Sequence, residues 1–325
     1  MIRSKHETSF ERAFINARTN QIKRNIPFTV SYTGKIILVP ESDMTIDLPI
    51  REQLQFLSKY IVKICVEYEH DFTTIRLGGS GLIIDGQYII SAAHVFNPLR
   101  DNERQIPYQK IKFASLTLAS DHLFVSSNEH VFEAEMVFRG VSDNGLQPEN
   151  VCSVDEDFAI LRICDYDDVK NKLFLTNQSN YCPPRVLNKE ELKLNSQLFL
   201  LSYCGVVRKI EDVEYYEYCS QYPAYTRENL NCAMYPDHKS VSVGKCLESG
   251  NDFFSHDCPS LRGSTGGAIF DINGRFVGLH TGVKPDDIHY NIQGKKRLQP
   301  DALNQAFAAY SSRLKQCIES KMTWK

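Results

Sequence analysis

The sequence has no apolar run of about twenty residues, the length that a membrane-spanning helix needs, and it therefore predicts no membrane span. It also lacks an excess of one charge, because 37 lysines and arginines stand against 40 aspartates and glutamates. Without a basic surplus the chain cannot neutralise many phosphates, so we expect no nucleic-acid partner. Repeats of fixed period and low-complexity tracts are absent as well. What is present is an ordinary globular composition, with 42% hydrophobic residues over 325 positions.

The first thirty residues lack the unbroken apolar core of a secretory signal. They are locally basic, and Phe10, Phe14 and Ala17 share one helical face, which somewhat resembles a mitochondrial presequence. Glu7 and Glu11 argue against that interpretation, because such presequences are poor in acidic residues. We expect a solvated N-terminal helix and an intracellular, cytoplasmic protein, with mitochondrial import as the alternative.

Ten cysteines are present, which in a secreted chain would indicate disulfides. With no export signal in the sequence, we expect them to be reduced thiols. Five possible metal ligands fall close together: Cys232, His238, Cys246, His256 and Cys258. Their gaps do not match the paired C-x2-C spacing of structural zinc sites. We therefore predict buried or loop thiols here, and neither a metal nor another cofactor.

Beyond its N-terminal part the chain consists of short β-type runs separated by turn residues. The stretch 60–69, YIVKICVEYE, alternates and is rich in β-branched and aromatic residues, as a half-buried strand should be. Asp85-Gly86 and Asn273-Gly274 each join two apolar runs and predict hairpins, because such turns need positive φ. Further strands are expected within residues 110–119, 130–140, 158–163 and 196–205. Many short strands with regular turns favour an antiparallel barrel or sandwich.

Two segments differ from this pattern. Residues 211–258 are polar and tyrosine-rich and are interpreted as long loops. Near the C-terminus, apolar side chains recur at steps of three and four residues, as on one face of a helix. They are Leu303, Phe307, Tyr310, Leu314, Cys317 and Ile318. Pro300 and Asp301 suit a helix start, so we predict a docked amphipathic helix over about residues 300–321.

Three segments carry residues suited to acyl transfer by a hydroxyl group. Such chemistry needs a base to take the proton, an acid to hold the base's tautomer, and backbone N–H groups facing the developing oxyanion. His94 follows an apolar strand in SAAHVF, and Asp157 opens another strand in DEDFAILRI. The stretch LRGSTGGAIF supplies two hydroxyl groups, on Ser264 and Thr265, among glycines.

In this order the three segments resemble the trypsin-like peptidase superfamily. Within it they look most like the intracellular and bacterial branches, such as the HtrA-like and glutamyl-endopeptidase-like proteins. The shared motifs are a strand ending in A-A-H-V, a strand that starts D-[hydrophobic]-A-[hydrophobic]-L, and a G-x-S-G-type loop followed by V-G-[IL]-H. The match covers about residues 55–290. It implies an all-β fold of two antiparallel six-stranded barrels, at about residues 56–170 and 183–290, with a C-terminal α-helix and an N-terminal extension, residues 1–55.

The resemblance implies a role for each residue of these segments. His94 would be the general base, Asp157 its orienting acid and Thr265 the nucleophile. The backbone N–H groups of Gly263 and Thr265 would form the oxyanion hole, and glycine permits the backbone conformation that the hole requires. Asp155 is the less favoured acid, since the D-F-A-I-L register begins at Asp157.

Threonine stands where the family has its serine nucleophile, which leaves three interpretations open. Thr265 acts as a slow nucleophile, since its methyl group restricts χ1 and crowds a tight turn. Ser264 acts instead, although Arg262 would then occupy the place of the oxyanion glycine. The third interpretation is a pseudoprotease that binds a peptide or protein without chemistry. We favour an endopeptidase of reduced activity, because the other implied residues are in place, with the inactive binding module as the alternative.

Other departures separate the chain from secreted trypsins. Val95 stands where they have a cysteine beside the histidine, so that disulfide cannot form. Ser264 stands where they carry an aspartate that pairs with a freed N-terminus, so activity should not need that zymogen switch. Pro259 replaces the aspartate that attracts Lys or Arg in trypsin's pocket. We therefore expect no preference for basic residues.

Glutamyl endopeptidases place a pocket histidine fifteen residues after the nucleophile and a hydroxyl residue five before it. Those positions hold His280 and Ser260 here, and the resemblance places the pocket walls at Pro259–Arg262 and Gly278–Gly282. An imidazole and a hydroxyl can both donate to a carboxylate. We expect cleavage after acidic or small polar residues, with packing beneath the hairpin as the alternative role of His280.

Overall fold

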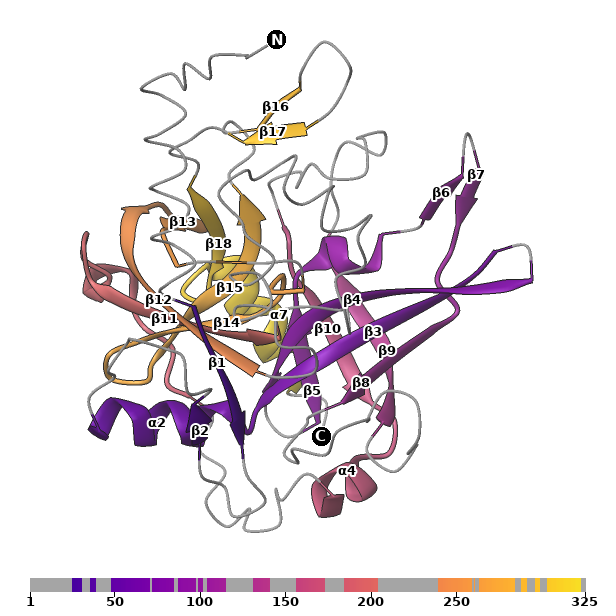
Figure 1. Cartoon of the computed structure of the whole chain (residues 1–325), viewed down its shortest axis with the longest axis horizontal. Coiled ribbons are helices and arrows are strands. Elements are labelled where there is room, and N and C mark those ends of the chain that lie inside the picture. The colour runs from indigo at the N-terminus through magenta and orange to yellow at the C-terminus, as the bar shows by residue number, and fades with distance from the viewer. Residues whose placement is uncertain are drawn as a thin grey trace, which may run out of the picture.

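The structure, a computed structural model, describes sixteen stretches of the chain. They are residues 25–30, 36–38, 48–70, 72–84, 87–97, 99–101, 104–114, 131–140, 156–172, 184–203, 239–258, 260, 263–283, 288–290, 296–298 and 303–322. Most of the regular structure is β, with a few short helices around it (Figure 1). In this described part, no helix is long and apolar enough to cross a membrane.

Six antiparallel strands close the first barrel, in the order β10-β5-β4-β3-β8-β9. Their bounds are β3 Ile61–His70, β4 Thr73–Ile84, β5 Tyr88–Ser91, β8 Lys110–Ala114, β9 Val131–Arg139 and β10 Ala159–Ile163. A short hairpin of β6 (Leu99–Asp101) and β7 (Arg104–Ile106) follows the 3-10 turn η1 (Ala93–Phe96), and α4 (Tyr166–Lys172) follows β10. We call this unit barrel 1.

The second barrel, barrel 2, runs β11-β14-β15-β18-β13-β12 and is closed by the β11–β12 pairing. Its strands are β11 Gln197–Tyr203, β12 Lys239–Ser249, β13 Phe253–His256, β14 Ala268–Asp271, β15 Phe276–Val283 and β18 Asn304–Ala308. β1 (Asn25–Val30) pairs with β12, and β2 (Ile36–Leu38) pairs with β1, so part of the N-terminal extension enlarges this sheet. The remaining elements are α2 Leu48–Ser58, η4 Lys189–Glu191, the hairpin β16 Ile288–Tyr290 with β17 Lys296–Leu298, and α7 Ser312–Met322. The prediction of two six-stranded antiparallel barrels with a C-terminal helix is confirmed.

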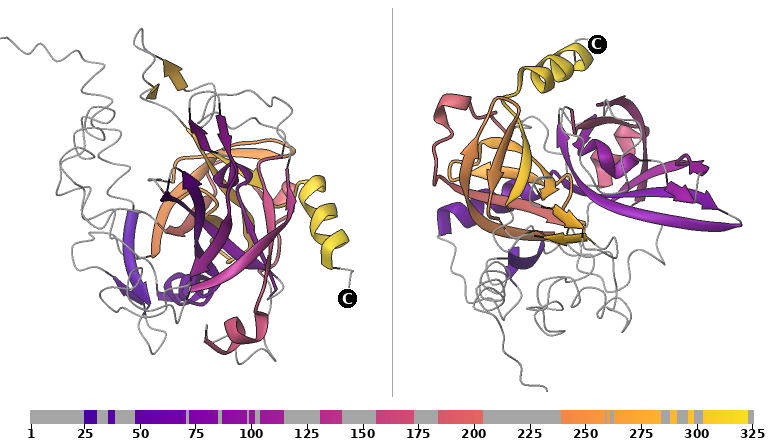
Figure 2. Two further views of the ribbon diagram at one scale, coloured as in Figure 1. Left: turned by 90° about the vertical axis from the view of Figure 1, so that its right-hand side faces the viewer. Right: turned by 90° about the horizontal axis from the view of Figure 1, so that it is seen from above.

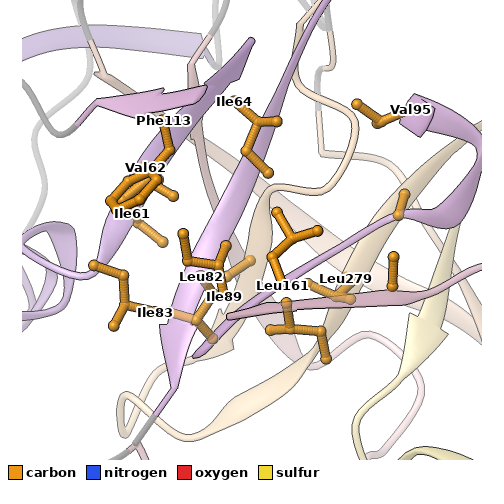
Figure 3. Close-up of a cluster of buried hydrophobic side chains, with 14 of the residues drawn as sticks. Ile61, Val62, Ile64, Leu82, Ile83, Ile89, Val95, Phe113, Leu161 and Leu279 are labelled. Atoms are coloured by element: carbon orange, nitrogen blue, oxygen red, sulfur yellow. The ribbon is translucent and has the colours of Figure 1, made fainter. Parts of the chain in front are cut away.

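The two barrels lie side by side and share one apolar core (Figure 2). Leu161 of β10 and Leu279 of β15 belong to the same cluster, although they come from different barrels (Figure 3). Phe158, just before β10, meets Phe307 of β18 with ring centroids 5.0 Å apart. The apolar seam therefore runs directly beside Asp157, which is itself only 4% exposed.

The C-terminal helix begins later than the sequence pattern indicated. Helix α7 starts at Ser312, not near residue 300, and residues 304–308 form β18 inside barrel 2. All five residues of β18 are buried, because one face lines the barrel interior and the other meets barrel 1. With both faces buried there is no period-two alternation, and the apolar spacing of three and four misleads.

The interpretation of residues 211–258 as long loops is wrong for its last part. Residues 239–249 form β12 and residues 253–256 form β13, whereas 211–238 lie outside the described residues. β12 begins with the largely polar run Lys239–Ser242, yet all four residues are buried, so both faces of the strand are covered here. Polar residues without alternation do not indicate a buried strand, which explains the wrong interpretation.

The Asn273-Gly274 hairpin is confirmed, since Gly274 has φ 68° in the turn between β14 and β15. Asp85-Gly86 lies outside the described residues, although β4 and β5 on either side pair as a hairpin. No disulfide joins the described cysteines, which are Cys65, Cys164, Cys246, Cys258 and Cys317.

Lys239 is a buried cation at the start of β12, only 2% exposed. Its Nζ donates to the carbonyl oxygen of Ser58, the last residue of α2, and lies 5.6 Å from the ring centre of Tyr203. A lysine that caps the last carbonyls of a helix stabilises it. Burial disfavours the charged form, however, and lowers the pKa of Lys239 from 10.5 to about 7.

The lowered pKa of Lys239 predicts a stability that depends on pH. Below about pH 7 both the folded and unfolded chains carry the proton and the cost of burying the charge is fully present. Between about pH 7 and 10.5 only the unfolded chain stays protonated, so the free energy of unfolding rises with pH, by up to about 1.4 kcal/mol per pH unit. In urea denaturation, the stability of Lys239→Met relative to the parent should therefore fall as pH rises through this window. Lys245→Met, an exposed site on the same strand, is the control, and parallel pH profiles for Lys239→Met and the parent would contradict the prediction.

Candidate active site

His94 and Asp157 form a two-point pair in barrel 1. The His94 ring Nδ1 lies 2.8 Å from Asp157 Oδ2, and the His94 backbone N–H donates to Oδ1 at 3.0 Å. The carboxylate is buried, and the imidazole side chain is 30% exposed. With the proton of the neutral ring on Nδ1, facing the carboxylate, Nε2 carries the lone pair of a base.

Strand pairing explains why these two residues meet. β5 and β10 are antiparallel neighbours, with Ser91 opposite Ala159. His94 comes three residues after Ser91, in η1, and Asp157 comes two residues before Ala159. The end of one strand and the start of its antiparallel neighbour lie at the same edge of the barrel. The D-F-A-I-L register chosen from the sequence thus puts Asp157 beside His94, while Asp155 lies outside the described residues.

The loop that carries Thr265 enters β14 through a tight turn. Gly263 and Gly266 have φ of 94° and 81°, values that side chains other than glycine rarely adopt. Gly267 N–H donates to Ser264 O at 2.8 Å inside the turn. The loop also pairs with β15, since Gly266 N–H donates to His280 O and His280 N–H donates to Gly267 O, both at 2.8 Å.

Two backbone N–H groups of this loop stand apart from the rest. Among the described residues, no acceptor pairs with the N–H of Gly263 or of Thr265. The Ser264 side chain is fully buried, whereas Thr265 is partly exposed. The hydroxyl that can meet a ligand is therefore that of Thr265. Two N–H groups without an intramolecular acceptor match what an oxyanion hole requires.

Barrel 1 holds the Thr265 loop directly. Ser80 N–H in β4 donates to Thr265 O at 2.7 Å, and the hydroxyl of Ser80 donates to Gly263 O at 2.8 Å. A Cβ added at Gly79 would lie 3.0 Å from the Val95 side chain and 3.2 Å from Thr265 O. The side chain of Val95, which follows His94, and the carbonyl oxygen of Thr265 thus both lie close to Gly79. In the described residues, no hydrogen bond joins the Thr265 hydroxyl to His94.

A pair of buried histidines lies inside barrel 2. Cys258 N–H donates to His256 Nδ1 at 3.2 Å, so the neutral His256 carries its proton on Nε2. That nitrogen lies 3.2 Å from His280 Nδ1, which must accept, so His280 carries its proton on Nε2 as well. Burial lowers the pKa of His256 to about 3. Burial, then the nearby His256 and His94, lower the pKa of His280 well below its usual value, so both rings are neutral at pH 7.

The free end of this chain is the Nε2–H of His280. Among the described residues, Nε of Arg139 is the one fully buried side-chain nitrogen or oxygen without a hydrogen-bond partner. The described residues provide no acceptor for the Nε2–H of His280 either, and the His280 side chain is 2% exposed. A neutral N–H donor of this kind can donate to the oxygen of a bound side chain.

The other two predicted pocket residues make close contacts within barrel 2. The Ser260 hydroxyl donates to Asn304 Oδ1 at 3.1 Å, and Asn304 in turn donates to Cys258 O at 2.6 Å. A Cβ added at Gly278 would overlap with Phe307 O and lie 2.7 Å from the Phe254 ring, so glycine permits the close packing of β15 on β18. The pocket roles of Ser260 and Gly278 stay predictions.

Sequence reasoning missed Ser80, Ser91 and Asn304, and it saw His256 only as a possible metal ligand. Their partners lie far away in sequence, 183 residues in the case of Ser80 and Gly263, so no local pattern reveals them. In the described part, no group of three or more His, Cys, Asp or Glu side chains could hold a metal ion. Cys232 and His238 lie outside the described residues.

Comparison with known proteins matches this geometry to one family. The family model described as trypsin-like peptidase domain matches residues 79–279, more than half of the chain. The chain belongs to the trypsin-like peptidase domain family. The match spans the His94, Asp157 and Thr265 segments and parts of both barrels.

Solved structures similar to the chain include two of the Rv3671c protease from M. tuberculosis. Its active form is 16% identical over 84% of this chain and 89% of that chain, with a TM-score of 0.45. An inactive form, a serine-to-alanine mutant, is 14% identical over 87% of this chain and 97% of that chain, with a TM-score of 0.43. Comparison with curated proteins found no match.

Because the Thr265 loop lies close against barrel 1, we predict that Gly266→Ala and Gly274→Ala lower the free energy of unfolding by different amounts. Gly266 and Gly274 both have positive φ, so Gly→Ala strains the backbone at each, by about 1–2 kcal/mol. At Gly266 the new Cβ would also overlap with Ser80 O and Ser91 Oγ, whereas at Gly274 it meets the flexible side chain of Gln53. In urea denaturation, Gly266→Ala should cost roughly 1–3 kcal/mol more than Gly274→Ala. Equal losses would show that the loop is not pressed against barrel 1.

Proposed function

We propose that this protein is an endopeptidase of the trypsin-like type that works slowly because its nucleophile is Thr265. The observation that carries the proposal is the two-point His94–Asp157 pair, which holds the proton of the neutral ring on Nδ1, so that Nε2 carries the basic lone pair. The ligands would be peptides or proteins, with no cofactor. We also propose a reducing, intracellular compartment, which suits a chain with no disulfide among its described cysteines.

The proposed reaction follows from the groups at hand. The Thr265 hydroxyl oxygen attacks the scissile carbonyl carbon while its proton passes to His94 Nε2. The N–H groups of Gly263 and Thr265 donate to the oxyanion that forms. His94 then returns the proton to the leaving amine, and water releases the acyl group from Thr265 by the same steps. Asp157 keeps the proton of the neutral ring on Nδ1 and stabilises the charged ring.

The threonine methyl group is the reason for the expected slowness. A β-branched side chain has fewer χ1 rotamers, so fewer of them aim the hydroxyl at His94. Internal threonine also lacks the N-terminal amine that threonine nucleophiles elsewhere use as a base. A misplacement on the order of 1 Å can cost about 100-fold in rate.

Labelling with a fluorophosphonate probe tests the nucleophile. We expect slow labelling of the parent, none of His94→Ala or Thr265→Ala, and unchanged labelling of Ser264→Ala, because Ser264 is buried. Thr265→Ser should label and cleave peptide substrates about 10- to 100-fold faster, since the methyl group is gone. If no variant reacts while the cleft still binds peptides, the protein is the inactive binding module.

We further propose that His280 selects the side chain before the scissile bond. Its Nε2–H is a neutral donor without an acceptor among the described residues, and its Nδ1 is held by His256. Pro259 provides no carboxylate, so a basic side chain gains no ion pair there. Acidic and small polar side chains offer the acceptor that His280 lacks. Ser260 would assist only by turning its hydroxyl away from Asn304.

Cleavage profiling of the Thr265→Ser protein on a peptide library tests this selection. We expect acidic or small polar residues over Lys and Arg, and loss of that preference in His280→Ala, whereas His70→Ala in barrel 1 changes nothing. Because burial keeps both barrel 2 histidines neutral, the ratio of kcat/KM for acidic over basic peptides should stay constant between about pH 6 and 8. A ratio that falls as pH rises through about 6.5 would show that a charged imidazole is needed. A Lys or Arg preference would refute the proposal.

A further inference from the structure

Ser80 of β4 uses every polar group it has at the boundary between the barrels. It is fully buried. Its N–H donates to Thr265 O at 2.7 Å, its hydroxyl donates to Gly263 O at 2.8 Å, and the same hydroxyl oxygen accepts from Tyr203 N–H at 2.9 Å. Its carbonyl accepts from the Ser91 hydroxyl at 2.7 Å. One residue of barrel 1 thus contacts the Thr265 loop twice and β11 once.

The two loop carbonyls that Ser80 holds flank the peptide that carries the Thr265 N–H. A peptide unit is planar and trans, so fixing its carbonyl fixes the opposite N–H. The Ser264 carbonyl between them is held by Gly267 N–H at 2.8 Å. Three successive carbonyls of the loop, those of Gly263, Ser264 and Thr265, are therefore fixed, two of them by Ser80.

The hydrogen bond from Ser80 is most important at the carbonyl group of Gly263. Its φ of 94° lies in a region that glycine reaches freely, and glycine also leaves it just as freely. Without the Ser80 hydroxyl, nothing else among the described residues holds the Gly263 carbonyl. The peptide could then rotate and turn the adjacent N–H groups away from the substrate.

We propose that Ser80 is a positioning residue, which holds the Thr265 loop so that the N–H groups of Gly263 and Thr265 face the reacting carbonyl. This inference rests on the proposed peptidase function. The glycines on either side of Ser80 make the approach possible, because a Cβ at Gly79 would crowd Val95 and Thr265 O, and one at Gly81 would lie 2.8 Å from Ile64 and Ile89.

The test compares Ser80→Ala with Ser80→Thr, which keeps the hydroxyl, both in the full-length Thr265→Ser protein. Ser311→Ala is the matched control, because it also removes a buried hydroxyl, one that donates to Asp252. The first measurement is amide hydrogen exchange of peptides that cover residues 263–268, below the unfolding temperature of each variant. The second is the separate determination of kcat and KM on a peptide substrate.

The hydrogen-exchange measurement does not need an active enzyme. Ser80→Ala leaves two buried partners without their hydrogen bonds, so exchange in the loop should rise by about tenfold or more, while β18 stays unchanged. Ser80→Thr and Ser311→Ala should leave loop exchange at the parent's rate. Unchanged exchange in Ser80→Ala would overturn the inference, whatever the activity.

The kinetic measurement separates positioning from general support of the fold. We expect kcat of Ser80→Ala to fall by roughly 10- to 100-fold with KM within about threefold, since donors to the oxyanion act mainly in the transition state. Recovery in Ser80→Thr would support the role of the hydroxyl. A rise of KM alone, or an equal loss in Ser311→Ala, would overturn it. Thr265→Ser itself could be inert while loop exchange still increases in Ser80→Ala. That result would overturn the proposed peptidase function, and Ser80 would then be a structural residue that orders the loop.

Discussion

A site that is divided between two barrels depends on the interface that fixes one barrel against the other. Here that interface is apolar and begins at the residue after the proposed acid, because Phe158 packs on Phe307 of β18 and on Phe138 of β9. Leu279 of β15 enters the same cluster one residue before His280. Close-packed interiors have few alternative arrangements. The packing that joins the barrels therefore also places Asp157 against barrel 2 and His280 against barrel 1.

Where this interface reaches the Thr265 loop, its chemistry changes from apolar side chains to serines and glycines. Loop carbonyls buried between two barrels need donors, and the hydroxyl and N–H of Ser80 supply them. Donors can reach those carbonyls only if the backbones approach closely, which explains Gly79 on one side and Gly266 on the other. The same few residues thus satisfy buried polar groups and set the loop geometry. Two N–H groups of the loop, those of Gly263 and Thr265, are left without an acceptor among the described residues.

The sequence predicted those parts of the fold whose residue types are typical of strands and turns. β-branched and aromatic residues located β3, although it is buried on both faces, and turn chemistry located the Asn273-Gly274 hairpin. The prediction failed for β12, which begins with a largely polar run, and for β18, whose apolar residues continue the three- and four-residue spacing of a helix. In the candidate site, the motifs located His94, Asp157 and Thr265, but the contacts of Ser80 and His256 depend on strand register across the barrels. Register between distant strands is a property of the whole sheet and leaves no local pattern in the sequence.

The interior of barrel 2 bears on whether the cleft recognises a side chain or only encloses one. Two neutral imidazoles, those of His256 and His280, are buried in the core of barrel 2. Burying a polar ring nitrogen costs free energy unless it is hydrogen-bonded, whereas an apolar side chain needs no such partner. Three of their four ring nitrogens have partners, in a chain that starts at Cys258 N–H and fixes both tautomers. A purely structural pair would end that chain on an internal acceptor. It ends instead on the Nε2–H of His280, for which the described residues provide no acceptor, and this favours recognition of an acceptor-bearing side chain over packing alone.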